Sequence, residues 1–231
     1  MSTIYTNISE HRKKAEEQLL ADYPMVASLY EIMDAYFTCV MVRLKNVKIK
    51  DQNNEGYKLK LLLSFMRSNF SLSDLVKGSE HIDAYTLLRK QLELLARFTE
   101  LNTKTKEELE KSKKTPNVSN VVGMQSFYGY LSNIAHSTSY MILSDIFAYE
   151  KQIERKVGLS MQPQYNEFTI DTLCLQCELF IRFATEMLDF QSVHVADYDP
   201  EQDIMILTRF LQVGVESKLE FFDRFREWLG Y

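Results

Sequence analysis

Residues 79–102, SEHIDAYTLLRKQLELLARFTELN, form the longest strongly periodic segment of the chain. At about 100° per residue, their apolar side chains fall on one wide arc and on a narrower strip roughly opposite to it. A helix that is apolar on two sides lies inside a bundle rather than on its surface. The arc contains Ile82, Tyr85, Leu88, Leu92, Leu95, Ala96 and Thr99, and the strip contains Leu87, Leu94 and Leu101.

This central helix carries a charge within its apolar arc. Arg89 lies inside the arc, and Glu93 follows one turn later at its edge. An unpaired buried guanidinium is costly, so Arg89 needs an acceptor. Glu93 at position i+4 is the nearest candidate, and its offset suggests that another helix also contributes. We therefore predict that Arg89 is largely buried and paired with Glu93 or with a carboxylate of another helix.

The composition around this helix favours an all-α fold. The chain has 231 residues, 45% of them hydrophobic and 26% charged, which is an ordinary globular balance. It has only 7 Gly and 4 Pro, too few for the turns of an all-β protein. No repeat or long linker divides the chain, so we expect a single helical domain over 1–231, a bundle of six to eight helices. After a first helix at about 9–22, the core helices are expected at about 24–46, 57–77, 79–102, 119–150, 169–190 and 200–229.

Charge and cysteine content favour a cytoplasmic protein. The net charge is −5, so a general affinity for nucleic acid is not implied. The amino terminus is too polar for a secretory signal, and no apolar run approaches the roughly 20 residues of a membrane span. The 3 cysteines are an odd number, as expected for reduced thiols. We therefore expect a cytoplasmic location and no membrane partner.

A second polar set lies on the helix predicted at 119–150. Tyr128, Ser132 and His136 follow each other at four-residue spacing beside an apolar stripe. If this helix packs against the one that carries Arg89, these side chains complete a polar network. Such a network could serve as an acid/base or anion-binding site, with His136 as the titrating group. It could instead be a structural cluster that fixes the register of two helices, and the sequence favours this interpretation because it shows no activated nucleophile.

The remaining candidate groups do not form a metal or cofactor site. Cys174 and Cys177 make a single C-x-x-C within a strongly helical pattern, without a second pair of ligands. We interpret them as buried apolar residues. His81 lies near a helix start and is expected to face solvent. His194 lies in a turn with acidic neighbours but without ligand spacing, and glycine-rich nucleotide motifs are absent. We expect no metal and no cofactor.

The two polar motifs resemble those of an uncharacterised all-helical bacterial family. The run from Phe65 to Leu101 and the later YGYLSNIAHS carry the likeness, which covers about 60–145. Members read roughly A-x-x-L-x-R-x-x-x-E on one helix and Y-x-x-x-S-x-x-x-H on a later one. The first motif is matched here by Ala84, Arg89 and Glu93, with Leu88 one place off the pattern, and the second by Tyr128, Ser132 and His136.

More distantly, the chain is similar to the HEPN-type bundles of toxin–antitoxin and phage-defence systems. This resemblance implies a helical bundle, a role in stress or phage defence and, in some members, ribonuclease activity. The HEPN ribonucleases carry an R-x4–6-H motif on one helix. In this sequence no arginine stands at that spacing before His136 or before any other histidine.

These observations favour a non-catalytic helical-bundle protein that acts through protein or ligand contacts. One alternative is an HEPN-like ribonuclease in which Arg89 holds an RNA phosphate and His136 acts as general acid or base. A second alternative is a small-molecule sensor with an apolar pocket between helices. Binding residues in any of these cases are Arg89, Glu93, Tyr128, Ser132 and His136.

The carboxyl-terminal segment EFFDRFREWLGY predicts self-association. It concentrates more aromatic and apolar side chains than one face of a domain can bury. An exposed aromatic patch usually marks a contact surface. We therefore expect a homodimer formed through this last helix.

Overall fold

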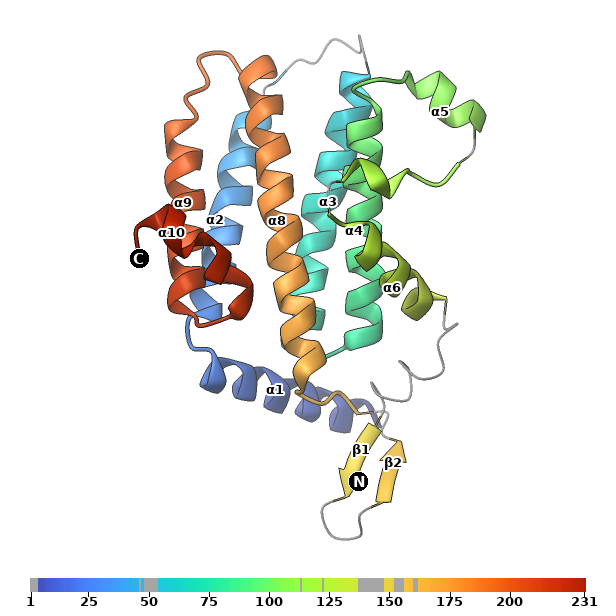
Figure 1. Ribbon diagram of the computed structural model, residues 1–231, viewed down its shortest axis with the longest axis vertical. Helices are drawn as coiled ribbons and strands as arrows, with labels where there is room; N and C mark the ends of the chain where they lie inside the picture. The colour runs from blue at the N-terminus through green and yellow to red at the C-terminus, as the bar shows by residue number, and fades with distance from the viewer. Residues whose placement is uncertain are drawn as a thin grey trace.

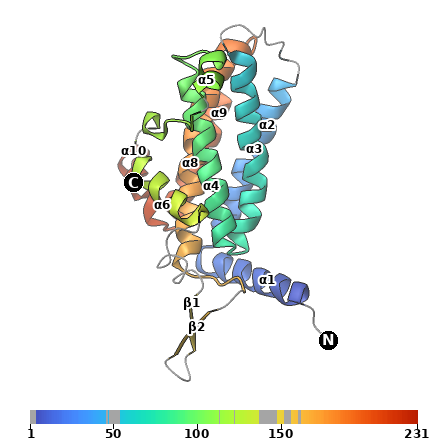
Figure 2. The same cartoon turned by 90° about the vertical axis from the view of Figure 1, so that its right-hand side faces the viewer.

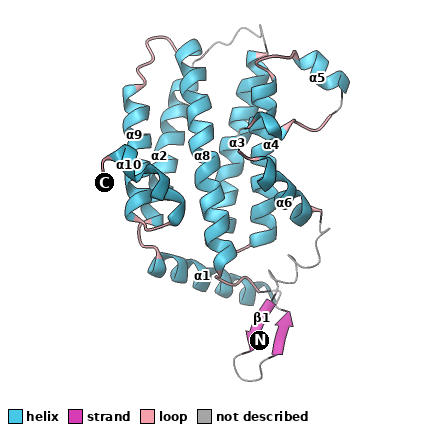
Figure 3. Cartoon of the chain, in the orientation of Figure 1, coloured by secondary structure: helices cyan, strands magenta, loops and turns pink. Residues whose placement is uncertain are grey.

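The computed structural model describes residues 4–45, 47, 54–112, 114–121, 123–136, 148–151, 156–159 and 162–231. Within these ranges the protein is a helical bundle with one small hairpin, and the all-α prediction is confirmed (Figure 3). The helices of at least eleven residues are α1 (Ile4–Asp22), α2 (Val26–Leu44), α3 (Glu55–Lys77), α4 (His81–Glu100), α6 (Gln125–Ala135), α8 (Glu167–His194) and α9 (Glu201–Glu216). Shorter elements are α5 (Lys106–Ser112), α10 (Arg226–Leu229) and the 3-10 helices η1 (Val118–Asn120) and η2 (Glu220–Phe225).

Five helices, α2, α3, α4, α8 and α9, run side by side along the long axis of the molecule (Figures 1 and 2). Helix α1 lies across one end of this bundle, at 101° to α2. Helix α4 contacts α3, α6 and α8, as expected for the element with two apolar sides. Among the helices described, none is by itself both long and apolar enough to cross a membrane, although the bent pair α1 and α2 passes that test together.

Aromatic side chains fill the space between α2, α3 and α8. Phe65 of α3 stacks on Phe183 of α8, with ring centroids 4.5 Å apart. Phe37 of α2 packs edge-on against the same Phe183 ring at 5.5 Å. Tyr36 and Phe180 make a further edge-on pair at 5.5 Å, and all of these side chains are buried. Such offset and edge-on contacts add to the stabilisation from burying the rings, so this cluster joins segments far apart in the sequence.

The helix predicted at 119–150 is much shorter in the structure. The described part of this segment holds η1 and then α6, which ends at Ala135, with His136 as its C-cap. Residues 137–147 of the prediction lie outside the described residues. Residues Ala148–Lys151 form a strand, β1, antiparallel to β2 (Lys156–Leu159). The apolar spacing that suggested one helix therefore runs past His136, where the described helix α6 ends, and does not by itself mark that end.

The helix predicted at 200–229 is interrupted. Helix α9 ends at Glu216, and Lys218 adopts a left-handed conformation with φ 63°. The Ser217 hydroxyl donates to the Gly214 carbonyl and accepts from the Leu219 amide, which closes the turn. Because Gly214 has no side chain, the Phe222 ring packs directly against α9. The chain therefore folds back as η2 and α10 beside the bundle rather than extending it.

The junction between α3 and α4 is a tight turn at Gly78 and Ser79. A glycine after a helix often adopts the left-handed conformation, but the φ of Gly78 is −79°, and Ser79 is the left-handed residue, with φ 55°. The Glu80 amide donates to the Leu75 carbonyl across this turn. A side chain at Gly78 would clash with Arg12 of α1, 2.8 Å from the Cβ position. The absence of a side chain at Gly78 therefore lets Arg12 pack closely against this turn, and the φ angle of Gly78 does not itself favour glycine.

Candidate functional site

The structure brings four of the five predicted binding residues together where α6 crosses α4. Arg89 and Glu93 come from α4, and Tyr128 and His136 come from α6. The Ser132 hydroxyl makes no hydrogen bond to these four residues, all of which lie in the described part of the chain. We call Arg89, Glu93, Tyr128 and His136 the α4–α6 cluster.

Arg89 is the centre of this cluster. Its Nε donates to Glu93 Oε1 at 3.0 Å, and its Nη2 donates to the Tyr128 hydroxyl at 3.3 Å. The Tyr128 hydroxyl in turn donates to Glu93 Oε1 at 2.9 Å. The guanidinium also lies over the Tyr128 ring, 5.4 Å from its centroid. The contacts of Tyr128 with Arg89 and Glu93 link α6 to α4, and the contact between Arg89 and Glu93 orients the Arg89 side chain.

His136 completes the cluster through its ring. Its Nε2 lies 2.7 Å from Arg89 Nη1. An arginine has donors only, so His136 Nε2 must accept this hydrogen bond and carries no proton. Burial opposes the charge on Arg89, but the Tyr128 hydroxyl and the Glu93 carboxylate outweigh it and raise the pKa of Arg89. The arrangement therefore joins Arg89, as the donor, to a histidine whose Nε2 is the acceptor.

The cluster is only partly shielded from solvent. The Arg89 side chain is 17% exposed and the Glu93 side chain 27%, while His136 is exposed. Arg89 is thus mostly buried and paired with Glu93, as the sequence predicted. His136 is more accessible than a fully buried structural group would be. The geometry alone therefore fits a structural cluster and also leaves a histidine edge open to a ligand.

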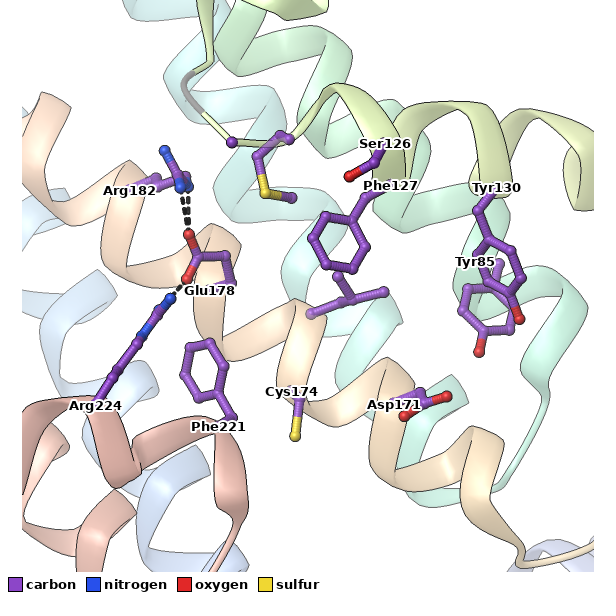
Figure 4. Close-up of a pocket in the computed structure, with 13 residues that line it drawn as sticks. Tyr85, Ser126, Phe127, Tyr130, Asp171, Cys174, Glu178, Arg182, Phe221 and Arg224 are labelled. Carbon is purple, nitrogen blue, oxygen red and sulfur yellow. Dashed lines mark hydrogen bonds and ion pairs between the residues drawn. The ribbon is translucent and has the colours of Figure 1, made fainter.

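A separate cavity of about 690 Å³ is lined in part by α6 but by none of the four residues of the α4–α6 cluster (Figure 4). Its walls come from α4, α6, α8 and η2, elements that are far apart in the sequence. The volume lies within the roughly 300–1,000 Å³ typical of small-molecule sites. The apolar part of the lining includes Met124, Phe127, Leu175 and Phe221.

One end of this cavity holds a charged triad, defined as Glu178, Arg182 and Arg224. Arg182 Nε donates to Glu178 Oε1 at 2.5 Å, and Arg224 Nη2 pairs with Glu178 Oε2. The Arg224 guanidinium lies over the rings of Phe221 and Phe225, 4.4 and 4.7 Å from their centroids. The triad therefore joins α8 to η2 and presents two guanidinium groups at the cavity.

The other end of the cavity is acidic and phenolic. Burial, followed by the charge of Glu167, raises the pKa of Asp171 above its ordinary value. Burial and the neighbouring Tyr130 raise the pKa of Tyr85, so the phenol stays protonated. Burial and the charge of Asp171 raise the pKa of the Cys174 thiol to about 12. A thiol with this pKa is a poor nucleophile at neutral pH, so the cavity has no activated cysteine.

The sequence analysis raised an apolar pocket between helices as an alternative but assigned no lining residues to it, although part of its signal was visible. Asp171, Glu178 and Arg182 recur at seven- and four-residue spacing along one face of an otherwise apolar helix. This is the spacing of side chains that share a helical face. Arg224 could not have been assigned, because its contact with Glu178 depends on how η2 folds back.

The other candidate residues, two histidines and two cysteines, make structural contacts or show no arrangement that binds a ligand. His81 was expected to face solvent, but it is buried, with Nε2 3.0 Å from the Thr169 hydroxyl. His194 Nε2 lies 2.8 Å from Glu55. Cys174 and Cys177 are free thiols, the second fully buried. Among the described residues, no three His, Cys, Asp or Glu side chains are arranged to hold a metal ion.

Comparisons with protein-family models, with curated proteins and with solved structures found no match. Function is therefore inferred from the chemistry of the α4–α6 cluster and of the cavity.

Proposed function

We propose that the protein is a non-catalytic cytoplasmic helical bundle that acts through ligand or protein contacts. A role in stress or phage defence is part of this proposal and rests only on the family resemblance. In this proposal the α4–α6 cluster is structural: it holds α6 against α4 and so fixes one wall of the cavity.

The observation that carries the proposal is the engagement of Arg89 with protein atoms. Its Nε, Nη1 and Nη2 contact Glu93, His136 and Tyr128 at 3.0, 2.7 and 3.3 Å. These contacts use three of the five N–H donors of Arg89, one on each nitrogen, so only one donor on Nη1 and one on Nη2 remain for an RNA phosphate. Its nearest anion is already Glu93, which would repel a phosphate at the same position. These contacts favour a structural role over phosphate binding.

A ribonuclease similar to the HEPN enzymes is the second candidate. It is favoured by one observation, the 2.7 Å approach of Arg89 Nη1 to an exposed His136. A histidine that is unprotonated at Nε2 could accept a proton from a ribose 2′-hydroxyl, provided that Arg89 moved aside. The two candidates make opposite predictions for purified protein.

The test is to incubate the protein with single-stranded and with structured RNA. We expect no cleavage. His136→Gln retains a carbonyl oxygen that can accept from Arg89, so we expect its melting temperature to stay close to that of the natural sequence. His136→Ala removes the acceptor, with a loss of about 0.5–1.5 kcal/mol in the free energy of unfolding.

His11→Gln is the matched control, because His11 lies on α1 and outside the cluster. RNA cleavage by the natural sequence and by His11→Gln, but not by His136→Gln, would contradict the proposal and establish the ribonuclease. Absence of cleavage together with destabilisation by His136→Ala supports the structural role.

A further inference from the structure

The cavity beside α6 has a basic end whose charge is not fully neutralised. Two guanidinium groups, from Arg182 and Arg224, share the single Glu178 carboxylate. Together they have more N–H donors than one carboxylate can accept. Glu178 is largely buried, whereas Arg224 is about half exposed. This end therefore has a net positive charge and N–H donors that Glu178 does not use.

The walls next to the basic end are aromatic and apolar. Phe221 packs on the Arg224 guanidinium, and Phe127 lies across the cavity from it (Figure 4). Phe127 is 44% exposed, so part of its ring surface is free to contact a ligand. Met124 and Leu175 add further apolar surface. A flat apolar group could thus lie between these walls with its anionic end at the arginines.

The opposite end of the cavity, at Asp171, disfavours a second negative charge on a ligand. Asp171 precedes Glu178 by seven residues on α8, which is about 10 Å along the helix. Its carboxyl group and the Tyr85 and Tyr130 rings line that end (Figure 4). A ligand with anionic groups at both ends would place one of them beside Asp171. The cavity therefore distinguishes between ligands with one and with two anionic ends.

We propose that this cavity binds a small amphipathic anion, with an aromatic or aliphatic body between Phe127 and Phe221 and a carboxylate, phosphate or sulfonate at Arg182 and Arg224. This inference rests on the proposed function, since it names the ligand class for a protein that acts through contacts. It needs no step in which a bond is formed or broken.

The probe is 8-anilinonaphthalene-1-sulfonate, an aromatic anion whose fluorescence rises in apolar surroundings. N-phenyl-1-naphthylamine has the same aromatic body without the sulfonate and reports the apolar contribution alone. We expect the sulfonate to bind the folded protein with one site, and more tightly than the neutral compound. Phenyl phosphate and benzoate should displace it, whereas terephthalate, with a carboxylate at each end, should displace it less well.

Two variants test the contacts. Arg224→Gln leaves Glu178 paired with Arg182, so the fold is kept, and we expect about tenfold weaker sulfonate binding. Arg226→Gln is its matched control, because Arg226 belongs to the same segment, is similarly exposed and pairs with Asp223, but does not line the cavity. Ser126→Trp places a large side chain at the cavity wall and should block both probes, whereas Gln125→Trp, one residue earlier, should not.

Equal affinity of the sulfonate for the natural sequence, Arg224→Gln and Arg226→Gln would overturn the proposal. So would binding that survives Ser126→Trp, or no binding at all by protein with a native circular dichroism spectrum. These results are distinct from RNA cleavage, which contradicts the proposed function and leaves the binding measurements unchanged. Loss of binding in Arg224→Gln and Ser126→Trp alone supports the proposal.

Discussion

His81 is a neutral histidine buried between α4 and α8. It is 4% exposed, and its Nε2 lies 3.0 Å from the Thr169 hydroxyl, which also bonds the Ser79 hydroxyl at 2.8 Å. Burial lowers the pKa of His81 to about 4. The unfolded chain, with a histidine pKa of about 6.5, therefore takes up protons before the folded protein does. Stability is complete above the unfolded pKa and is lost as pH falls toward 4.

We predict that this histidine reduces the free energy of unfolding by about 2 kcal/mol between pH 7 and pH 5. The measurement is urea denaturation of the natural sequence and of His81→Gln at both values. The variant, which has no titrating ring at this position, should show a smaller pH dependence. If the pH dependence of His81→Gln equals that of the natural sequence, the prediction is wrong. Protonated His81 would then have a partner in the folded protein, such as the adjacent Glu80.

Sequence pattern alone predicts some of these residues and not others. Arg89, Glu93, Tyr128 and His136 could be grouped because each is a polar side chain on an apolar helical face, and four-residue spacing brings such groups into line. His81 could not be assigned as buried, because its position at a helix start is usually solvated. Its burial results from α8, whose Thr169 lies against it. Tertiary contacts of this kind have no local signal.

At the scale of elements, two arginine–carboxylate pairs lie at contacts between helices, in different surroundings: Arg43–Asp203 joins α2 to α9, whereas Arg89–Glu93 lies within α4 where α6 crosses it. Arg43 of α2 pairs with Asp203 of α9 at 2.6 Å, and Asp203 has no exposed surface. Gln191 and Tyr198 also donate to Asp203, at 3.0 and 2.6 Å. In the α4–α6 cluster, by contrast, Glu93 is partly exposed and keeps the Tyr128 donor when Arg89 is removed.

We predict that Arg43→Ala lowers the free energy of unfolding by about 3–5 kcal/mol, because it leaves a fully buried carboxylate without its cation. Arg89→Ala should cost only about 1–2 kcal/mol, because water and Tyr128 can still solvate Glu93. Urea denaturation of both variants measures the difference. Asp203→Asn in the Arg43→Ala background should recover part of the larger loss. Equal losses for the two arginine variants would contradict this ranking.

Element positions were largely predictable, and the errors have physical causes. The apolar periodicity placed α2, α3, α4 and α8 to within about four residues of their ends, because each presents a continuous buried face. It failed where a periodic pattern continued through a break, as at His136 and at Lys218. The reversal at Lys218 depends on Gly214 accepting the Phe222 ring. Neither feature changes the spacing of apolar residues.

At the scale of the whole molecule, the carboxyl-terminal segment divides its aromatic residues between core and surface. Phe222 is fully buried, and Phe221 and Phe225 hold Arg224 at the cavity. Trp228 is 67% exposed and Tyr231 62%. The protein therefore buries one set of these rings and leaves another on the surface of the same segment.

We propose that two copies of the chain associate through this surface. Exposed aromatic side chains contribute strongly to interfaces, because they bury a large area at low cost in conformational entropy. Light scattering at micromolar concentration should give the mass of a dimer. Trp228 is the only tryptophan of the 231 residues, so its fluorescence reports this surface directly. Its emission should shift to the blue as concentration rises, because association removes the indole from water.

Tyr231→Gln should weaken the dimer while keeping Trp228 as the reporter, and its emission should stay red-shifted at concentrations where the natural sequence is blue-shifted. Met205→Gln is the matched control, because Met205 is also an exposed apolar residue, but it lies on α9. We expect this variant to dimerise like the natural sequence. A monomeric mass for the natural sequence, with red-shifted emission at every concentration, would refute association through this surface. Weakening by both variants would instead place the contact on α9 as well, since Met205 would then belong to the interface.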